Sequence, residues 1–343
     1  MNPEELIHRR VTMSDVAAAA HVHKSTVSLA LRNQPKLNAV TRERIRRIAE
    51  ELGYRPDPML DLFNLHRLEL APQRQAGAIA FVSDMPSAAA FARSERHEEI
   101  FSSAREEAKR LNFTLELFLV GQTQLSPARL SQVLQARGIS GILLGVLSPG
   151  TRILNIDWES FCVVGIESIQ VEPRVDNVST DYCRAARLAS LQLWQRSNRK
   201  IGFVFAEDLG SEIEGQLRAG YLVESHAQNP IRTVSSCRIA EQDDVGRMAE
   251  WIRTEKLGAI VGCGVNVAEL GAKLPPDSAH RVAWCSIDIR NRQSECPGVP
   301  ALHGDLGRRA VELLSMRLQN NLRGLPANPA TTFFPVEWRG QQP

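Results

Sequence analysis

From Gly77 onward, short runs of β-type residues alternate with amphipathic helical segments, and this alternation restricts the fold more than any other feature of the sequence. It favours parallel sheets, because parallel strands need a long crossover connection between them. The stretch is too long for one ordinary domain, so the pattern predicts two doubly wound α/β lobes. The predicted strands lie at 78–82, 114–120, 141–147, 161–166, 200–205, 232–236, 259–263 and 282–287, and the predicted helices at 98–111, 182–196, 241–255 and 305–321.

The first 53 residues have a different pattern, which predicts three short helices. Thr12 and Asp15 have the spacing of a capping box at the start of the first helix. The second helix is predicted over 24–32, with its apolar residues on one side. Asn38 is suited to cap the third helix and Gly53 to end it. This segment therefore predicts a small all-α domain.

Charge also separates the two parts of the chain. Residues 8–58 contain ten Lys/Arg and five Asp/Glu, a net charge of +5. Of the 41 Lys/Arg and 39 Asp/Glu in the whole chain, this leaves 31 and 34, a net charge of −3 for the remainder. A compact basic end on a slightly acidic body is typical of a module that binds a polyanion. The alternative is a basic face that is merely solvated.

The absence of several sequence features argues against whole classes of protein. No apolar stretch approaches the roughly 18 residues of a spanning helix, and residues 1–10 do not resemble a signal peptide, so we expect no membrane partner and a cytoplasmic location. The six cysteines form no Cys-x-x-Cys pair and indicate reduced thiols. Residues 83–88 contain no glycine-rich dinucleotide turn, and no P-loop or G-x-S-x-G motif occurs. We therefore expect no cofactor, no bound metal and no enzymatic activity.

Residues 12–32 have the spacing of a helix-turn-helix, in which the second helix presents its N-terminal half to the DNA major groove. The candidates for base contacts on that helix are Lys24, Ser25, Leu29 and Arg32. The candidates for phosphate contacts carry hydroxyl, amide or imidazole groups at or near helix starts, and they are Thr12, Ser14, His23, Thr26, Ser28, Asn38 and Thr41. The alternative function of the three helices is protein contact. DNA binding is the favoured interpretation because the segment is also basic.

The order and spacing of residues over 11–58 resemble the headpiece of the lactose/galactose-repressor (LacI/GalR) family. The resemblance rests on Thr12-Met13-Ser14-Asp15-Val16-Ala17, Val22-x-Lys24-Ser25-Thr26-Val27-Ser28-Leu29-Ala30-Leu31-Arg32-Asn33, Thr41-Arg42 and Leu52-Gly53-Tyr54-Arg55-Pro56. It implies a transcription factor that binds a pseudo-palindromic double-stranded DNA operator as a homodimer. Two positions depart from the family, because His21 stands where the turn usually has Gly and His23 where the cap is usually Ser. Histidine tolerates a left-handed backbone better than most residues, so we expect the turn to form.

The same resemblance implies a hinge helix that forms on DNA and inserts apolar side chains into the minor groove. Counted from Tyr54 and Pro56, the inserting position falls on Phe63, with Leu62 beside it. The linker is longer than usual in the family by about two helical turns. The alternative is that residues 59–65 pack permanently against the partner subunit.

The body of the chain is similar to the regulatory core of this family, which is itself similar to periplasmic sugar-binding proteins. The stretches that carry the similarity are 163–166, 178–181, 199–204, 286–288 and 304–314. The similarity implies a small-molecule effector, such as a carbohydrate, bound between two lobes. The candidate effector-binding residues are Asp84, Arg218, Asn266 and Asp288, and Leu217 stands where the family has an arginine. A helix cap or a surface charge is the alternative role of each candidate.

The sequence therefore predicts an all-α helix-turn-helix headpiece joined to a two-lobed α/β core of doubly wound parallel sheets, like that of periplasmic binding proteins. The expected boundaries are 1–58 for the headpiece, 59–75 for the hinge helix or linker and 76–343 for the core, with lobe 1 at about 76–197 and 304–328 and lobe 2 at about 198–303 and 329–343. The predicted function is a DNA-binding transcriptional regulator, a repressor rather than an activator. The alternative is a small-molecule-binding protein or enzyme of α/β fold with a basic helical appendage.

Overall fold

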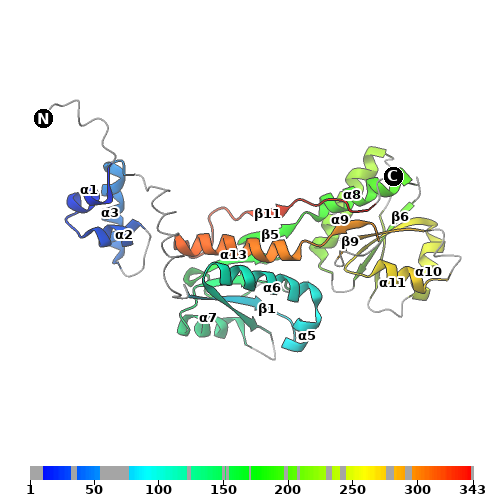
Figure 1. Ribbon diagram of the computed structural model, residues 1–343, viewed down its shortest axis with the longest axis horizontal. Coiled ribbons are helices and arrows are strands. Elements are labelled where there is room, and N and C mark those ends of the chain that lie inside the picture. Colours follow the sequence, from blue (N-terminus) through cyan, green and yellow to red (C-terminus); the bar gives the residue numbers. More distant parts are fainter. Residues whose placement is uncertain are drawn as a thin grey trace.

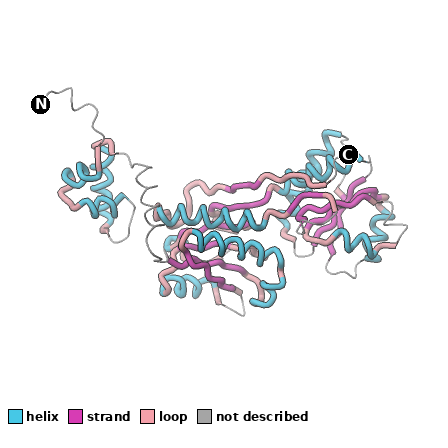
Figure 2. The backbone as a smooth tube through the Cα atoms, viewed as in Figure 1, coloured by secondary structure: helices cyan, strands magenta, loops and turns pink. Residues whose placement is uncertain are grey.

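The protein was analysed as a computed structural model, drawn as a ribbon in Figure 1 and as a backbone tube in Figure 2. The structure describes residues 11–31, 37–54, 77–121, 125–148, 151, 154–169, 171–196, 200–206, 209–228, 234–239, 245–275, 282–289 and 296–340. Within these residues a three-helix headpiece precedes an α/β core that contains two parallel sheets. This architecture confirms the fold class predicted from the sequence.

Three short helices form the headpiece: α1 (Met13–Ala19), α2 (Lys24–Leu31) and α3 (Ala39–Glu51). Their apolar sides meet in one small core, in which Val16, Val27 and Ile45 are fully buried. The predicted capping box is present, because Thr12 Oγ1 accepts a hydrogen bond from Asp15 N and the Asp15 carboxylate accepts one from Thr12 N. A core of so few residues depends on such local caps to fix where each helix begins.

The turn between α1 and α2 contains the left-handed residue that the sequence suggested. His21 has a φ of +50° directly after α1, so the prediction that histidine lets this turn form is confirmed. His23 immediately precedes α2, and its carbonyl oxygen accepts a hydrogen bond from Thr26 N at 2.8 Å. Asn38 caps α3, and Gly53 follows that helix with a φ of +69°, as predicted.

The first sheet has six parallel strands in the order β11-β5-β4-β3-β1-β2. These strands are β1 (Gly77–Ser83), β2 (Phe113–Leu119), β3 (Gly141–Leu144), β4 (Cys162–Ile166), β5 (Asp176–Thr180) and β11 (Thr331–Phe334). One face is covered by α5 (Ala88–Arg93), α6 (Glu95–Arg110) and α13 (His303–Gln319), and the other by α7 (Pro127–Ala136). A single 3-10 turn, η2 (Trp158–Ser160), precedes β4. The rings of Phe81 on β1, Phe91 on α5 and Phe101 on α6 meet in T-shaped, edge-to-face contacts.

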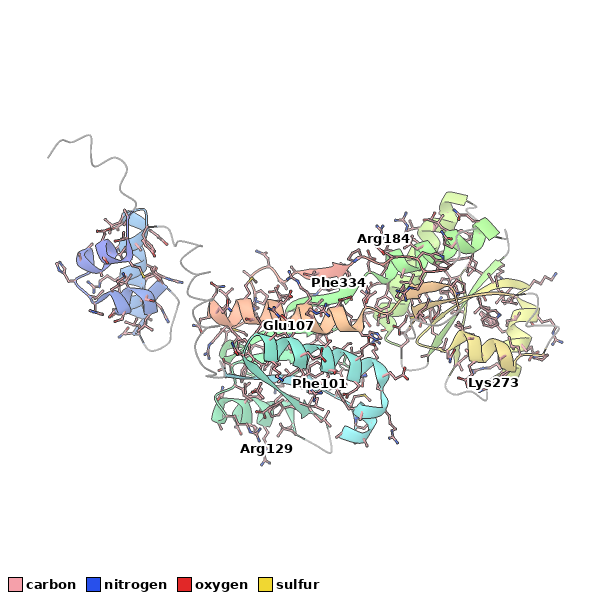
Figure 3. All side chains as sticks on the ribbon, viewed as in Figure 1. Phe101, Glu107, Arg129, Arg184, Lys273 and Phe334 are labelled. Carbon is pink, nitrogen blue, oxygen red and sulfur yellow. The ribbon has the colours of Figure 1, made fainter. Side chains whose placement is uncertain are left out.

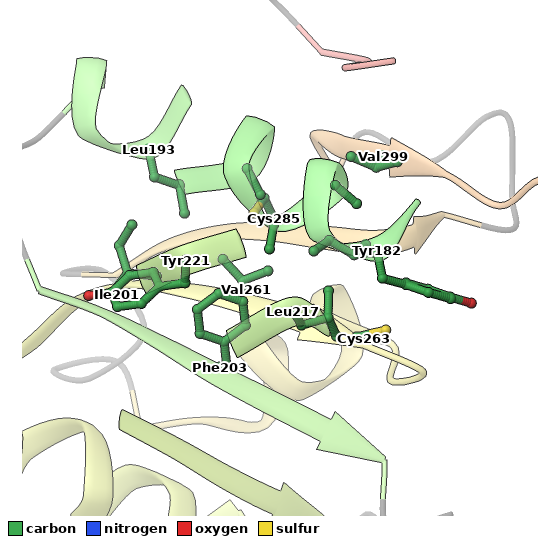
Figure 4. Packing of buried hydrophobic residues seen from close by; sticks show 14 of the residues in the cluster. Tyr182, Leu193, Ile201, Phe203, Leu217, Tyr221, Val261, Cys263, Cys285 and Val299 are labelled. Atoms are coloured by element: carbon green, nitrogen blue, oxygen red, sulfur yellow. The ribbon is translucent and has the colours of Figure 1, made fainter. Parts of the chain in front are cut away.

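The second sheet has five parallel strands in the order β10-β9-β8-β6-β7. These strands are β6 (Lys200–Ala206), β7 (Ser235–Ile239), β8 (Leu257–Cys263), β9 (Ala283–Ile289) and β10 (Gly298–Pro300). One face is covered by α8 (Tyr182–Arg196) and α9 (Ser211–Gln228), and the other by α10 (Val245–Thr254) and α11 (Val267–Lys273). Figure 4 shows Leu193, Phe203 and Tyr221 packed on the first of these faces. Arg184 on α8 and Lys273 on α11 mark the two sides of this lobe in Figure 3.

Three segments differ from the sequence prediction. The sequence predicts α8 in lobe 1, within 76–197, but α8 packs on the second sheet because Ala185, Ala189 and Leu193 are buried in that lobe's core. The sequence predicts 329–343 in lobe 2, but β11 pairs with β5 of the first sheet, with Thr331 opposite Asn177. The strand predicted at 232–236 is found at Ser235–Ile239.

The chain consequently passes between the two lobes three times. It leaves β5 for α8, leaves β10 for α13, and after β11 returns to the second lobe, where Val336 is buried and Arg339 pairs with Gly298. Each passage starts at the carboxyl end of a strand. The strands within each sheet are parallel, so all carboxyl ends of a sheet lie on the side from which these passages leave, which is the junction between the lobes. Open α/β sheets bind their ligands at the carboxyl ends of the strands.

Candidate functional site

The N-terminal turn of α2 is accessible on the headpiece. Lys24 and Ser25 are exposed, and Leu29, one turn further along, is half-buried. Val27 and Ala30 are fully buried and hold the helix to the headpiece core. The structure therefore leaves three of the four predicted base-contacting residues within reach of a ligand.

The start of α2 is also suited to an anion. Ser25 Oγ lies 2.8 Å from His23 Nδ1, and the same nitrogen accepts a hydrogen bond from Ser25 N at 3.3 Å. His23, Lys24 and Ser25 are all exposed. The N–H groups of Ser25 and Thr26 are bonded to His23, so an anion here would meet the exposed side chains and the positive end of the helix dipole. Phosphate oxygens are the groups that such a helix start binds.

The other candidates for phosphate contact differ in their hydrogen bonds and in their exposure. The Thr12 hydroxyl lies 2.7 Å from Asp15 Oδ2, and Asn38 Oδ1 accepts a hydrogen bond from Val40 N at 2.9 Å, so both side chains serve as helix caps. The remaining candidates differ in exposure, since Ser14 is exposed and Thr26, Ser28 and Thr41 are half-buried. Any contact of Thr12 or Asn38 with phosphate would be made in addition to a capping role.

Three predicted DNA-contacting residues lie outside the described residues. They are Arg32, just beyond the last described residue of α2, and Leu62 and Phe63 in the linker. Their base and minor-groove contacts stay predictions.

A cavity of about 390 Å³ lies at the junction between the lobes. The first lobe contributes Glu95 from the start of α6. The second lobe contributes the ends of β8 and β9 and the start of α11, including Asn266 and Asp288. A volume of this size lies within the range that holds a small molecule. Two of the four predicted effector-binding residues therefore line one cavity.

The other two predicted effector-binding residues are engaged elsewhere. The Asp84 carboxylate accepts hydrogen bonds from Ser148 N at 2.9 Å and from Thr151 Oγ1 at 2.6 Å, which joins the segments that follow β1 and β3. Arg218 forms an ion pair within α9 and donates a hydrogen bond to Ser236 Oγ on β7 at 2.6 Å. Neither is among the described residues that line the cavity. These contacts favour a structural role for both.

Asp288 links the two lobes through a buried histidine. Its Oδ1 lies 3.2 Å from His303 Nε2, and His303 Nδ1 lies 3.2 Å from Glu99 Oε2 on α6. Asp288 has a φ of +88°, which residues with a side chain rarely adopt and which occurs most often at functional sites. Asn266 has a second role, because its Oδ1 caps α11 by accepting a hydrogen bond from Glu269 N.

A second link between the lobes was not predicted from the sequence. Glu167 follows β4 with a φ of +51°, and its side chain is 1% exposed. It forms an ion pair with Arg96 of α6 and accepts a hydrogen bond from Tyr182 OH, at the start of α8, at 2.9 Å. Burial raises the pKa of Tyr182 well above its usual range, with Arg96 opposing the shift, so the hydroxyl remains a donor. The signal available in the sequence was a carboxylate directly after the apolar run 161–166.

Comparison with known proteins identifies the headpiece. Residues 12–57 match the family described as "Bacterial regulatory proteins, lacI family". The headpiece is a LacI-family domain. HTH-type transcriptional repressor CytR of Escherichia coli (strain K12) is 50% identical to this chain over 48 residues, which are 14% of this chain and 14% of CytR. NTD biosynthesis operon regulator NtdR of Bacillus subtilis (strain 168) is 25% identical over 212 residues, 62% of this chain and 60% of NtdR. These matches span less than two thirds of the length of the two relatives.

Solved structures of transcriptional regulators share the fold over most of this chain. The transcriptional regulator CelR–cellobiose complex has a TM-score of 0.61 at 19% identity, over 97% of this chain and 99% of that chain. The lac repressor dimer bound to operator and the anti-inducer ONPF has a TM-score of 0.55 at 14% identity, over 97% and 99%. The periplasmic binding protein/LacI transcriptional regulator from Alkaliphilus metalliredigens QYMF, complexed with D-xylulofuranose, has a TM-score of 0.56 at 16% identity, over 77% and 98%. A LacI-family headpiece is thus followed here by a core of the periplasmic-binding-protein type.

Two further properties concern the part of the chain that the structure describes. None of the helices described is both long and apolar enough to cross a bilayer. The described His, Cys, Asp and Glu residues form no group of three or more that could hold a metal ion.

Proposed function

We propose that the protein is a transcriptional regulator that binds a pseudo-palindromic DNA operator as a homodimer, and that a small molecule bound between its lobes changes its affinity for that operator. The observation that carries the proposal is the LacI-family headpiece, in which α2 leaves Lys24 and Ser25 exposed. Repression is the favoured direction because CytR, which is 50% identical over 48 residues, is named a repressor. Access to chromosomal DNA requires a cytoplasmic location.

In the proposed complex α2 lies in the major groove. The Lys24 ammonium donates to guanine, the Ser25 hydroxyl donates to or accepts from a base edge, and Leu29 contacts a thymine methyl group. We also propose a base contact for Arg32, the residue that follows α2 in the sequence. The groups at the helix starts contact phosphate and set the register of the headpiece. The exposed ones among them are Thr12, Ser14, His23 and Asn38. Leu62 and Phe63 enter the minor groove between the two headpieces.

A homodimer fits this mode of recognition because one headpiece can contact only a few base pairs. Two headpieces related by a two-fold axis recognise two half-sites whose separation is fixed by the protein. A change in the distance between the headpieces then decides whether both half-sites can be occupied at once.

The position of the cavity supports a mechanism for such a change. Glu95 belongs to the first lobe and Asp288 to the second, so a ligand that contacts both binds more tightly at one angle between the lobes than at another. This difference in affinity is what couples ligand binding to operator binding. The three chain passages between the lobes are the segments that would bend.

The test begins with selection of genomic DNA fragments by the purified full-length chain, followed by measurement of affinity for the selected operator. We expect Lys24→Ala and Leu29→Ala each to change the preferred bases, at a cost of about 1–3 kcal/mol of discrimination at the position contacted. Arg46→Ala on α3 is the control, and it should at most weaken binding evenly across sequences. Affinity should fall steeply with salt, because lysine and arginine contacts to phosphate release counterions.

Two results would contradict the proposal at different levels. Unchanged base preference in both α2 variants would place the base-contacting surface elsewhere on the headpiece. A folded full-length chain that prefers no duplex at low salt would refute DNA recognition itself.

A further inference from the structure

The ring of His23 is bonded to Ser25 at the start of α2. His23 directly precedes the helix, and its ring nitrogen Nδ1 lies 2.8 Å from the hydroxyl oxygen of Ser25. The same nitrogen accepts a hydrogen bond from the backbone N–H of Ser25 at 3.3 Å. Both residues are exposed, and Ser25 is one of the residues proposed above to contact a base. The way in which His23 holds this hydroxyl therefore affects which base edges it can bind.

The backbone donor determines which ring nitrogen of His23 carries the hydrogen. A neutral imidazole has one N–H group and one nitrogen with a lone pair, and only the latter can accept from Ser25 N. Nδ1 is therefore the acceptor, and the ring hydrogen is on Nε2. An oxygen atom 2.8 Å from that lone pair must donate its hydrogen, because two acceptors at this distance repel each other. The Ser25 hydroxyl hydrogen thus points to His23, and the oxygen lone pairs remain for other partners.

The direction of this hydroxyl matters because the major groove presents both donors and acceptors. Each base pair has one amino group there, which is N6 of adenine in an A·T pair and N4 of cytosine in a G·C pair. The acceptors are O4 of thymine, O6 of guanine and N7 of either purine. A free serine hydroxyl can rotate and bind either kind of group. A hydroxyl whose hydrogen is held by a neighbouring ring can only accept, so it can bind only the amino group.

We propose that His23 is a positioning residue that restricts Ser25 to the amino group of an adenine or a cytosine in the operator. The inference rests on the proposed function, because it takes α2 as the helix that contacts bases. In this arrangement Ser25 touches the base and His23 acts through it. The hydrogen on Nε2 of His23 remains a donor, which is the group that a phosphate oxygen requires. One state of the ring therefore serves both Ser25 and the phosphate contact proposed for His23.

The bond from Ser25 N to His23 also has a purely structural explanation, because it caps α2. Asn38 caps α3 in the same way, since its Oδ1 accepts a hydrogen bond from Val40 N at 2.9 Å. Asparagine and serine are both good caps, so His23→Asn and His23→Ser both preserve this role. They differ in their effect on Ser25. The Oδ1 of asparagine only accepts and continues to hold the hydroxyl hydrogen, whereas the hydroxyl of serine also donates and releases it.

The experiment measures the affinity of the full-length chain, at fixed salt, for the operator selected from genomic fragments. Ser25→Ala first identifies the base pair that Ser25 contacts, as the position at which sequence preference is lost. In a second duplex the amino group of that pair is removed, with purine in place of adenine or 2-pyrimidinone in place of cytosine. The thymine or guanine of the pair keeps its carbonyl oxygen. Any effect of the altered base on the duplex itself appears equally in Ser25→Ala, which is therefore the reference.

Relative to Ser25→Ala, we expect removal of the amino group to weaken binding of the wild type about 3–10-fold, the size of one neutral hydrogen bond. His23→Asn should show the full loss. In His23→Ser the released Ser25 hydroxyl can turn and donate to a nearby acceptor, so the loss should shrink to about twofold or less. Equal losses in wild type and Ser25→Ala would overturn the inference. Equal losses in His23→Asn and His23→Ser would reduce His23 to a helix cap and would also overturn it.

A second readout needs no DNA. In the full-length chain labelled with nitrogen-15 histidine, two-bond hydrogen–nitrogen NMR spectra show which ring nitrogen of each histidine carries the hydrogen. The signals of His23 are identified by their absence in His23→Asn. At about pH 8.5, well above the ordinary pKa of histidine, the hydrogen should be on Nε2. A hydrogen on Nδ1 would overturn the inference and leave the proposed function intact. A chain that binds no duplex would refute the proposed function, and the ring spectrum would still decide how His23 holds Ser25.

Discussion

Substitution of Gly307 by alanine tests the close packing of α13 against α6 in the first lobe. Gly307 is buried, and a Cβ atom there would lie closer than 3.0 Å to both Ser103 Oγ and the carbonyl oxygen of Ile100 on α6. The serine hydroxyl can rotate away. The carbonyl oxygen belongs to the helix backbone, so the two helices must move apart to make room, and the apolar residues they share in the core lose contact.

The cost follows from two opposing effects. Adding a methyl group to a packed interior costs about 1–3 kcal/mol, and a contact with rigid backbone falls at the upper end. Alanine regains up to about 1 kcal/mol relative to glycine within a helix. The net loss is therefore about 2 kcal/mol in the free energy of unfolding, or roughly 4–8 °C in melting temperature for a domain of this size.

Gly304 provides the matched control on the same helix, one turn earlier. The nearest atom to a Cβ at Gly304 is Ser103 Cβ at 4.0 Å, so the added methyl group meets no obstacle. We expect Gly304→Ala to leave stability unchanged or to raise it by up to about 1 kcal/mol. Urea unfolding followed by circular dichroism measures both variants, and hydrogen exchange locates the change.

In Gly307→Ala the amides of α6 and α13 should exchange faster, and those of α8 should not, because α8 packs in the other lobe. Equal stability of the two alanine variants would refute the close approach of the two helices. Equally faster exchange in both lobes would refute the conclusion that the contact is local to the first lobe.

Two further predictions concern buried polar groups. Arg317 is 6% exposed and donates hydrogen bonds to Asp176 at 2.7 Å and to the carbonyl oxygen of Leu322 at 3.0 Å. Arg317→Met should lower the free energy of unfolding by about 3 kcal/mol, because the Asp176 carboxylate, which is 16% exposed, would keep only its hydrogen bond from Ala330 N. Urea unfolding checks this, and a loss below about 1 kcal/mol would contradict it. Burial raises the pKa of Tyr182 above its unfolded value near 10, so the stability that its protonated form contributes is complete below that pH and falls as the pH rises further. Unfolding midpoints should therefore fall more steeply above about pH 10 in the wild type than in Tyr182→Phe, and parallel profiles would show that Tyr182 ionises as freely in the folded protein as in the unfolded chain.

The headpiece could be predicted from the sequence because its structure is determined locally. The capping box joins residues three apart, and the turn needs only a residue that accepts a left-handed backbone, which His21 supplies. Asn38 caps α3 through a hydrogen bond to a residue two positions on. Signals of this kind stand next to each other in the sequence, so their meaning does not depend on the rest of the fold.

The division of the core between the lobes could not be predicted in the same way. The apolar side of α8 indicates that the helix is buried, but it does not indicate which sheet buries it. Strand β5 was not recognised because its sequence, Asp-Asn-Val-Ser-Thr, is largely polar. The Oδ1 of its buried Asn177 accepts a hydrogen bond from Ser168 N at 3.1 Å, a partner that hydrophobic periodicity cannot show.

The carboxylates at the junction between the lobes also show what the sequence alone could not predict. Asp84, after β1, and Asp288, in β9, both lie near the carboxyl ends of strands, so both are candidates from the sequence, with ligand contact favoured for Asp288. Their partners separate them, because Asp84 accepts hydrogen bonds from its own lobe whereas Asp288 meets His303 at the passage between lobes and lines the cavity. Glu167 is distinguished in the same manner, since its hydroxyl partner, Tyr182, begins a helix of the other lobe. Whether a carboxylate at a strand end joins the two lobes depends on the partner that the opposite lobe supplies, and that partner depends on where the chain crosses between the lobes. Predicting those crossings is therefore the step on which recognition of the effector site depends.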